Sequence, residues 1–326
     1  MMMATSSGLI ISKKGFWMID SRNEWSNLKR IIVGSASNAH WPVKCPVFRR
    51  QEKTTKWSLT PVPKGPVSQN IIDEANEDLE QLSDTLKGLG VLVERPKNLD
   101  FQSFDGMYNY CPRDRLLILG SKVIDVPMLY PSRQKEIEAL SEIIETETIS
   151  CDEKGVILDA ANVCRLNNDL LYLVSESGNL KGARWLKSVL GNEYRIHILD
   201  NIYNGVHIDS TITPVREGLV VVNGDRINGN NLPEIFNDWE VISIQKSEIV
   251  EQNFIDYPYA SNYIALNFLV ISPELVICDP KQAILRRKLK EKGIYSIGIN
   301  LRHSRTLGGG HHCVTLDLLR ENYGIS

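Results

Sequence analysis

The chain has 326 residues, of which 42% are hydrophobic and 24% charged, so it is long and apolar enough to form a large buried core. Its formal net charge is −3, from 37 basic and 40 acidic residues, and no long run of either sign occurs. This balance offers no electrostatic footprint for nucleic acid or a membrane surface, so a small-molecule partner is the better expectation.

The six cysteines are too sparse for a disulfide scaffold and include no C-x-x-C pair. The first residues lack the apolar core of a secretory signal, and no segment reaches the roughly 18 apolar residues of a membrane span. We therefore expect reduced thiols and a cytoplasmic protein.

Strand-like and helix-like stretches recur in one order along the chain. Residues 157–199 are typical of strand, strand, helix, strand, and the order returns from residue 207 and from residue 263. A fourth copy begins at residue 115 and includes a predicted helix over 132–144. The two ends of the chain supply the fifth, with a long helix over 71–90. This recurrence predicts an α/β fold built from ββαβ units.

Five such units can close radially into a five-bladed α/β propeller with pseudo-fivefold symmetry. An open doubly wound α/β sheet is the competing architecture. The predicted hairpin at the start of each unit weighs against a purely parallel sheet. Because no linker divides the chain, we expect residues 1–22 to be a flexible N-terminal extension and residues 23–326 to be a single catalytic domain.

Polar residues stand before or within the first strand of each unit, namely Asp114, Asp159, His207, Asp209, Ser261 and Cys313. If the units surround an axis, these side chains converge on one central pocket. A pocket lined by three aspartates favours a cationic substrate, and a planar guanidinium suits carboxylates best. Cys313 then supplies a nucleophile and His207 a proton carrier.

The segment TLGGGHHC, residues 306–313, also allows other interpretations. A zinc site needs about four ligands, and this region has no second Cys/His pair. A phosphate loop needs G-K-[ST] and a helix after the glycines. Cys313 alone is more often a buried core cysteine, Asp159 a cap, and Asp114 or Arg226 a partner in a surface ion pair. We expect no metal ion and no cofactor.

Five motifs in order resemble the amidinotransferases of the guanidine-modifying enzyme superfamily, most closely the streptomycin-type enzymes. They are CPRD (111–114), DAANV (159–163), HIDST (207–211), NGDR (223–226) and TLGGGHHCVTLD (306–317). The resemblance runs from residue 23 to about residue 320. It implies a five-bladed α/β propeller with the active site on the central axis, in agreement with the count of units.

The resemblance also implies a reaction. Cys313 attacks the guanidinium carbon of L-arginine, ornithine leaves, and the amidino group passes from the cysteine to an acceptor primary amine. His207 carries protons and Asp159 orients it. The implied substrate-binding residues are Asp114 and Asp209 for the guanidinium, Arg226 for the α-carboxylate, Ser261, Asn204 and Val206 for other contacts, and His312 beside the nucleophile.

Two departures from the family pattern bear on the pocket. His311 stands where the family usually has phenylalanine, and residues 145–158 replace a longer insertion, which implies a more open pocket. The acceptor stays open among an amino acid, an aminocyclitol and a polyamine. The alternatives to transfer are hydrolysis by the same cysteine, as in arginine deiminase, and an inactive arginine-binding protein. A homodimer is only a family-level expectation.

Overall fold

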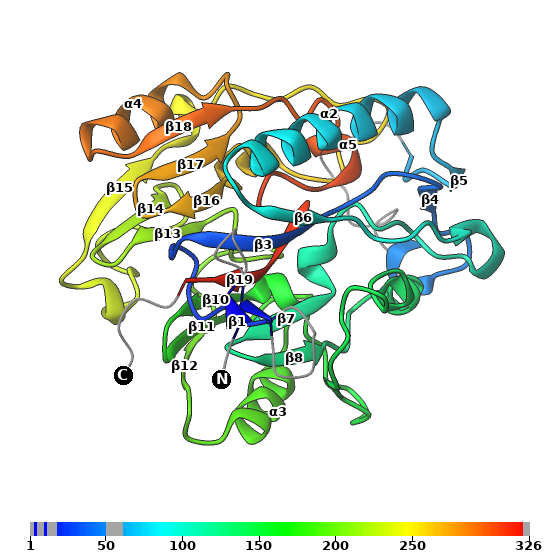
Figure 1. Ribbon diagram of the computed structural model, residues 1–326, viewed down its shortest axis with the longest axis horizontal. Helices are drawn as coiled ribbons and strands as arrows, with labels where there is room; N and C mark the ends of the chain where they lie inside the picture. The colour runs from blue at the N-terminus through cyan, green and yellow to red at the C-terminus, as the bar shows by residue number, and fades with distance from the viewer. Residues whose placement is uncertain (1–2, 5–9, 12–17, 50–60, 322–326) are drawn as a thin grey trace.

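The computed structural model describes residues 3–4, 10–11, 18–49 and 61–321, and within them five three-stranded sheets share one design (Figure 1). The strands, sheet by sheet, are β19 (Thr315–Arg320), β3 (Leu28–Val33) and β6 (Leu92–Glu94); β7 (Leu116–Leu119), β8 (Lys122–Asp125) and β9 (Thr148–Ser150); β10 (Val163–Leu166), β11 (Asp169–Leu173) and β12 (Arg195–Leu199); β13 (Ile212–Arg216), β14 (Leu219–Asn223) and β15 (Glu240–Ile244); β16 (Leu269–Ser272), β17 (Leu275–Cys278) and β18 (Tyr295–Gly298). Two short pairs lie outside these sheets: β1 (Met3–Ala4) with β2 (Ile10–Ile11), and β4 (His40–Trp41) with β5 (Gly65–Pro66).

In every three-stranded sheet the middle strand pairs antiparallel with the first and parallel with the third. The antiparallel pair needs only a tight turn, except where β19 and β3 come from opposite ends of the chain. The parallel pair needs a crossover connection. These crossovers contain α2 (Gln69–Gly88), α3 (Leu180–Leu190), α4 (Ala283–Glu291) and the 3-10 helices η3 (Pro131–Ala139) and η5 (Glu234–Phe236). The predicted α/β class is therefore confirmed, and so is the order strand, strand, helix, strand, with a 3-10 helix in place of the α-helix in two of the five units.

Two local expectations were wrong. The helix expected over 132–144 is the shorter 3-10 helix η3, in which a buried Arg133–Glu136 ion pair joins residues three apart, the spacing that eclipses in a 3-10 turn. Asp159 was expected within a strand, but it directly precedes the 3-10 turn η4 (Ala160–Asn162), and β10 begins only at Val163. The Asn162 amide donates to the Asp159 carbonyl at 3.0 Å, which closes this turn.

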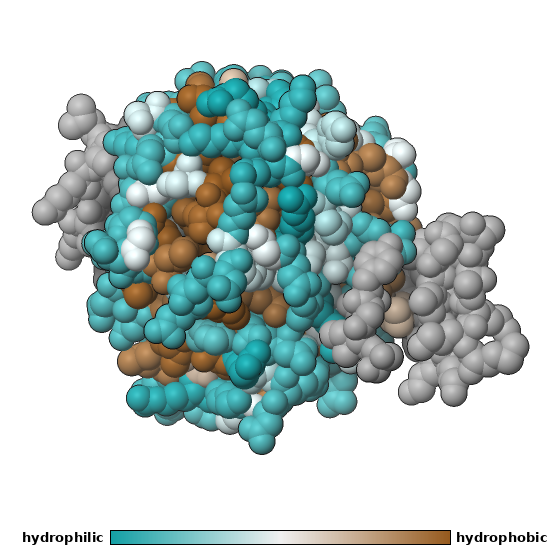
Figure 2. Space-filling view, turned by 90° about the vertical axis from the view of Figure 1, so that its left-hand side faces the viewer, coloured by the Kyte–Doolittle hydropathy of each residue, from teal (hydrophilic) through white to brown (hydrophobic). Residues whose placement is uncertain are grey.

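Within each sheet, burial decreases from the first strand to the third. β7, β10 and β19 are buried throughout, whereas β12, β15 and β18 expose Ile198, Val241 and Tyr295. Figure 2 shows apolar side chains in patches between polar ones on the face over α4, β15 and β18. The first strands therefore lie innermost, and whatever directly precedes them lies near the centre of the molecule.

The N-terminal segment joins this framework where it is described. The Asp20 amide donates to the Leu318 carbonyl at 2.9 Å, and Ser21 donates from its hydroxyl to Asp317 at 2.7 Å. Residues 1–2, 5–9 and 12–17 of the expected extension lie outside the described residues. None of the described helices is long and apolar enough to cross a membrane.

Candidate active site

Three glycines determine the backbone path of the segment that contains Cys313. The short helix α5 (Ser304–Leu307) ends at Gly308, whose φ of +85° is left-handed and suits glycine. A Cβ on Gly309 would lie 2.5 Å from the Cys111 Sγ, and one on Gly310 would lie 2.8 Å from Asn267. The backbone therefore packs too closely against Cys111 and Asn267 to leave room for side chains at these positions. Cys313 follows this segment and lies just before β19.

Cys313 lies against Asp209 and His312. The Cys313 Sγ donates to the Asp209 Oδ2 at 3.2 Å, and the same oxygen lies 2.9 Å from the His312 Nδ1. Asp209 comes from the turn before β13, and all three side chains are largely buried. The sequence placed Asp209 and Cys313 in one pocket, and their contact agrees with that.

His207 stands between the other two aspartates. Its Nε2 lies 3.2 Å from the Asp159 Oδ2, and its Nδ1 lies 3.7 Å from the Asp114 Oδ1. Asp159 makes no capping bond to η4; its other oxygen accepts from the Leu129 amide at 3.1 Å. The simple interpretation of Asp159 as a cap is thus wrong, because its carboxylate is directed at the imidazole.

This arrangement sets the charge of each group. Burial alone would lower the pKa of His207, but the charges of Asp114 and Asp159 outweigh it and raise that pKa to about 9. Burial, and then the charges of Asp209 and Asp114, raise the pKa of the Cys313 thiol well above its ordinary value. Burial also acts on Asp209, but the bond from His312 holds its pKa low. At neutral pH and without substrate, the site therefore holds Cys313 as a neutral thiol and His207 as an imidazolium.

Asp114 is held by a buried cation, and one of its oxygens accepts no hydrogen bond within the described part of the chain. Arg133 donates from Nη1 to the Asp114 Oδ2 at 2.7 Å and pairs with Glu136 on its other side. The Asp114 Oδ1 is buried without a hydrogen-bond partner among the described residues. Since an unpaired buried acceptor is costly, this oxygen is suited to accept an N–H from a ligand. The interpretation of Asp114 as a surface ion-pair partner was wrong.

Sequence reasoning missed the ionic chain behind His312. Its Nε2 lies 3.4 Å from the Glu24 Oε2, Glu24 pairs with Arg165 at 2.6 Å, and Arg165 pairs with Asp317 at 2.8 Å. Burial opposes the ionised form of Glu24, but Arg165 keeps its pKa well below the ordinary value. No sequence pattern distinguishes these buried charges from the surface charges around them.

Asn267 is a second omission. Its Oδ1 accepts from the Cys313 amide at 2.9 Å and from the His312 amide at 3.1 Å, and its Nδ2 donates to the Asp209 carbonyl at 3.3 Å. One buried side chain thus links the cysteine segment to the aspartate segment. An amide inside the apolar run IALNFLV was a signal for this role.

Arg226 lies close to the aspartate segment, outside the buried cluster. Its guanidinium donates to the Thr211 hydroxyl at 2.7 Å and stacks on the rings of Tyr203 and Tyr263, at 5.4 Å and 4.5 Å from their centroids. No carboxylate of the described residues lies within 4 Å of it, so Arg226 is not an ion-pair partner as one interpretation had it. A half-buried arginine without a counter-ion is suited to an incoming carboxylate.

Three predicted contact residues make no hydrogen bond or ion pair with the clustered side chains in the described part of the chain. Asn204 and Val206 are exposed in the segment before His207, and Ser261 precedes the 3-10 helix η7 (Asn262–Leu266). The Val206 carbonyl accepts from the Ser175 hydroxyl at 2.7 Å, which fixes the backbone next to His207. Their predicted role is contact with a bound substrate, and this role stays a prediction.

His311 packs away from the cluster. Its Nε2 lies 2.9 Å from the Ile299 carbonyl, and burial lowers its pKa to about 4. The ring is therefore neutral at physiological pH and fills core space. Among the described residues, no group of three or more histidine, cysteine and carboxylate side chains is placed to hold a metal ion.

Comparison with known proteins identifies the family. No family model matches the chain. Inosamine-phosphate amidinotransferase 1 of Streptomyces glaucescens is 38% identical and is matched over 93% of this chain and 97% of the relative. The solved structure of the Streptomyces griseus inosamine-phosphate amidinotransferase has a TM-score of 0.88 at 35% identity, over 93% of this chain and 97% of that one.

A third relative, the L-arginine:L-lysine amidinotransferase of Pseudomonas savastanoi pv. phaseolicola, is 27% identical over 92% of this chain and 94% of its own length. The chain thus resembles the inosamine-phosphate enzymes more than the lysine enzyme. Identity of 38% over nearly the full length of both chains, together with matching structure, means that this chain is an enzyme of the amidinotransferase family.

Proposed function

We propose that this enzyme transfers the amidino group of L-arginine to a primary amine through a covalent intermediate on Cys313. One observation carries the proposal: carboxylates surround a thiol and an imidazole, and one of their oxygens, the Asp114 Oδ1, has no hydrogen-bond partner among the described residues. Asp114 and Asp209 accept the N–H groups of the guanidinium, while Arg226 receives the α-carboxylate. The lysine enzyme among the relatives uses L-arginine, as its name states, which supports this donor.

The proposed chemistry begins with the charge of the donor. A guanidinium cation between Asp114 and Asp209 offsets the negative charge that raises the pKa of Cys313, so the thiol releases its proton to solvent water when the donor binds. The thiolate then attacks the guanidinium carbon and forms a C–S bond. His207, charged in the free enzyme, gives its proton to the leaving nitrogen as the C–N bond breaks, and ornithine departs.

The second half-reaction reverses these roles. Neutral His207 accepts a proton from the acceptor amine, whose nitrogen attacks the amidino carbon, and the C–S bond breaks to restore the thiolate. Asp159 keeps the ring of His207 oriented and favours its charged form. His312 holds Asp209 against the sulfur, and Ser261, Asn204 and Val206 contact the substrates at the entrance.

We also infer that the five sheets are the blades of a propeller around this site, within one domain spanning residues 23–326. The inner strands contact each other in sequence: β19 meets β7, β10 meets β13, and β13 meets β16. Arg165 of β10 donates to the Ile118 carbonyl of β7 at 3.4 Å, and Arg320 of β19 donates to the Val270 carbonyl of β16 at 2.9 Å. These contacts complete a ring, which supports radial closure.

The test is product analysis with L-arginine labelled at the guanidine carbon and a panel of amines: an amino acid, an aminocyclitol and a polyamine. We expect ornithine together with a labelled guanidino product from one of them. Citrulline and ammonia would contradict transfer and indicate hydrolysis. Cys313→Ala should abolish both products, whereas Cys151→Ala, a half-buried cysteine outside the cluster, should keep the wild-type rate.

A further inference from the structure

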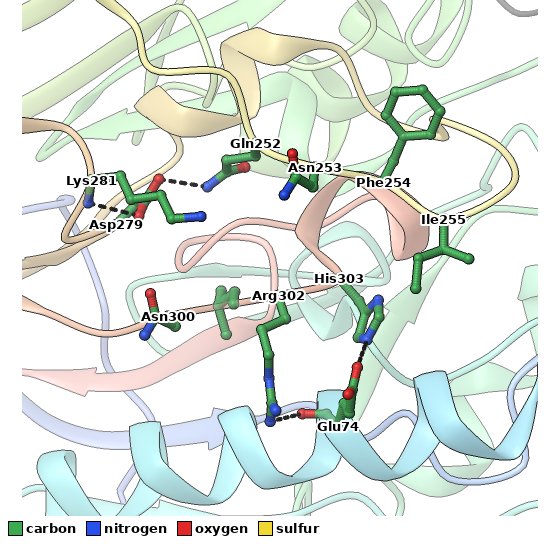
Figure 3. A pocket seen from close by; sticks show the side chains of 11 residues that line it. Glu74, Gln252, Asn253, Phe254, Ile255, Asp279, Lys281, Asn300, Arg302 and His303 are labelled. Carbon is green, nitrogen blue, oxygen red and sulfur yellow. Dashed lines mark hydrogen bonds and ion pairs between the residues drawn. The ribbon is translucent and has the colours of Figure 1, made fainter.

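A cavity of about 280 Å³ lies apart from the Cys313 cluster, between the start of α2 and the segments 252–255 and 300–303 (Figure 3). This volume holds on the order of ten water molecules, or a ligand with a comparable number of heavy atoms. None of its lining residues belongs to the proposed catalytic group, so any ligand here occupies a separate site.

One side of the cavity is cationic. The ammonium of Lys281 extends into the hollow, with the amides of Asn253 and Asn300 nearby (Figure 3). No carboxylate of the described residues lies within 4 Å of this ammonium. The neighbouring Asp279 is already occupied, because its Oδ2 accepts from Gln252 at 2.9 Å. Lys281 is therefore available for an anionic group.

The opposite side presents two acceptors. Glu74 lies 2.7 Å through its Oε2 from the His303 Nε2, and its other oxygen has no partner among the described residues. In the tautomer that donates from Nε2 to Glu74, the Nδ1 of His303 is an acceptor, and this atom is buried without a described partner. Such an orphaned buried nitrogen calls for a donor.

Arg302 does not serve as a second anion site. Its charge is already balanced, because Nε donates to Asp78 at 2.9 Å and Nη2 donates to the Glu74 carbonyl at 2.9 Å and to Glu77. The apolar part of the wall comes from Phe254 and Ile255, both of which are partly exposed. Within the described part of the chain, the cavity therefore offers a cation without an ion-pair partner at Lys281, a carboxylate at Glu74, and an apolar wall at Phe254 and Ile255.

We propose that this cavity binds a small zwitterionic amino acid, its carboxylate at Lys281 and an ammonium group at Glu74 and His303. Because the two charged ends lie on opposite sides of the hollow, the fit is best for an amino acid with a side-chain ammonium, such as ornithine or lysine. A dicarboxylate leaves Glu74 facing a like charge, and a diamine brings no carboxylate to offset the charge of Lys281.

The experiment is protection of Lys281 from acetylation in the wild-type protein, read by peptide mass spectrometry. Exposed Lys290 of α4, which does not line the cavity, is the internal control in the same sample, and its labelling corrects for reagent consumed by the probe. At about 10 mM, where even a millimolar site is mostly filled, L-ornithine or L-lysine should slow labelling of Lys281 relative to Lys290 about fivefold or more.

Succinate and putrescine should leave the Lys281 to Lys290 ratio unchanged, and Glu74→Gln should remove the protection by ornithine. An unchanged ratio with both amino acids would overturn the proposal, as would equal protection by succinate. The readout needs no turnover and no ligand at Cys313. A failure of the proposed transfer reaction and a failure of this site are therefore distinguishable.

Discussion

Replacing His207 by glutamine should change how stability depends on pH. In the unfolded chain this group has its ordinary pKa of 6.5, whereas Asp114 and Asp159 overcome burial and raise it to about 9 in the folded protein. The folded state therefore binds the proton more tightly. The resulting stabilisation is complete below pH 6.5 and is lost as pH rises through 9.

The size of the effect follows from the interval between the two pKa values. Each pH unit is worth about 1.4 kcal/mol, so the interval from 6.5 to about 9 corresponds to about 3 kcal/mol. The His207 side chain is only 19% exposed, so solvent screening reduces this little. His207→Gln should thus be about 3 kcal/mol less stable than wild type near pH 6 and nearly equal to it near pH 9.5.

The assay is urea denaturation of wild type and His207→Gln across that pH range. Titratable groups that both proteins share cancel in the difference between the two free energies of unfolding. A His207→Gln curve parallel to wild type at every pH would refute the reasoning, because it would mean that the carboxylates do not favour the imidazolium.

Three further substitutions test other parts of the site. Asp209→Asn should speed the alkylation of Cys313 by iodoacetamide, because it removes a neighbouring charge that raises the thiol pKa. The same substitution should lower kcat/KM for arginine; alkylation at an equal or lower rate than in wild type would be inconsistent with this role of Asp209. Arg226→Gln should raise KM for arginine roughly 10- to 100-fold, which is what a hydrogen bond to a charged group contributes. KM for agmatine, which lacks the carboxylate, should not change; an equal rise in KM for both substrates would contradict the proposed role. Glu24→Gln should lower the free energy of unfolding by about 3 kcal/mol in urea titrations, since Arg165 loses one of two buried partners; a change under about 1 kcal/mol would disagree.

The fold was predictable where hydrophobic periodicity is strong. The hairpins and the helices α2, α3 and α4 follow from alternating or helical apolar spacing, because burial of one face requires that spacing. The starts of the first strands were not predictable in the same way. The turn at 159–162 is closed by a backbone bond within the segment DAANV, so the apolar pattern continued past the true start of the strand.

The site was predictable to the extent that chemistry recurs at equivalent places. Asp114, Asp159, His207, Asp209 and Cys313 were grouped because each precedes or opens an inner strand, and the structure brings them within contact of one another in pairs. The supporting groups were missed because their role depends on three-dimensional burial. A glutamate such as Glu24 becomes a buried anchor only when a distant arginine, 141 residues along the chain, packs beside it.

The central claim is tested most directly by incubating the protein with L-arginine and no acceptor, quenching in acid, and mapping the peptide that contains Cys313 by mass spectrometry. The account predicts an amidino adduct on Cys313 and one equivalent of ornithine per adduct, with no adduct on the other cysteines. Ornithine without an adduct, an adduct on a different cysteine, or citrulline as the product would contradict it.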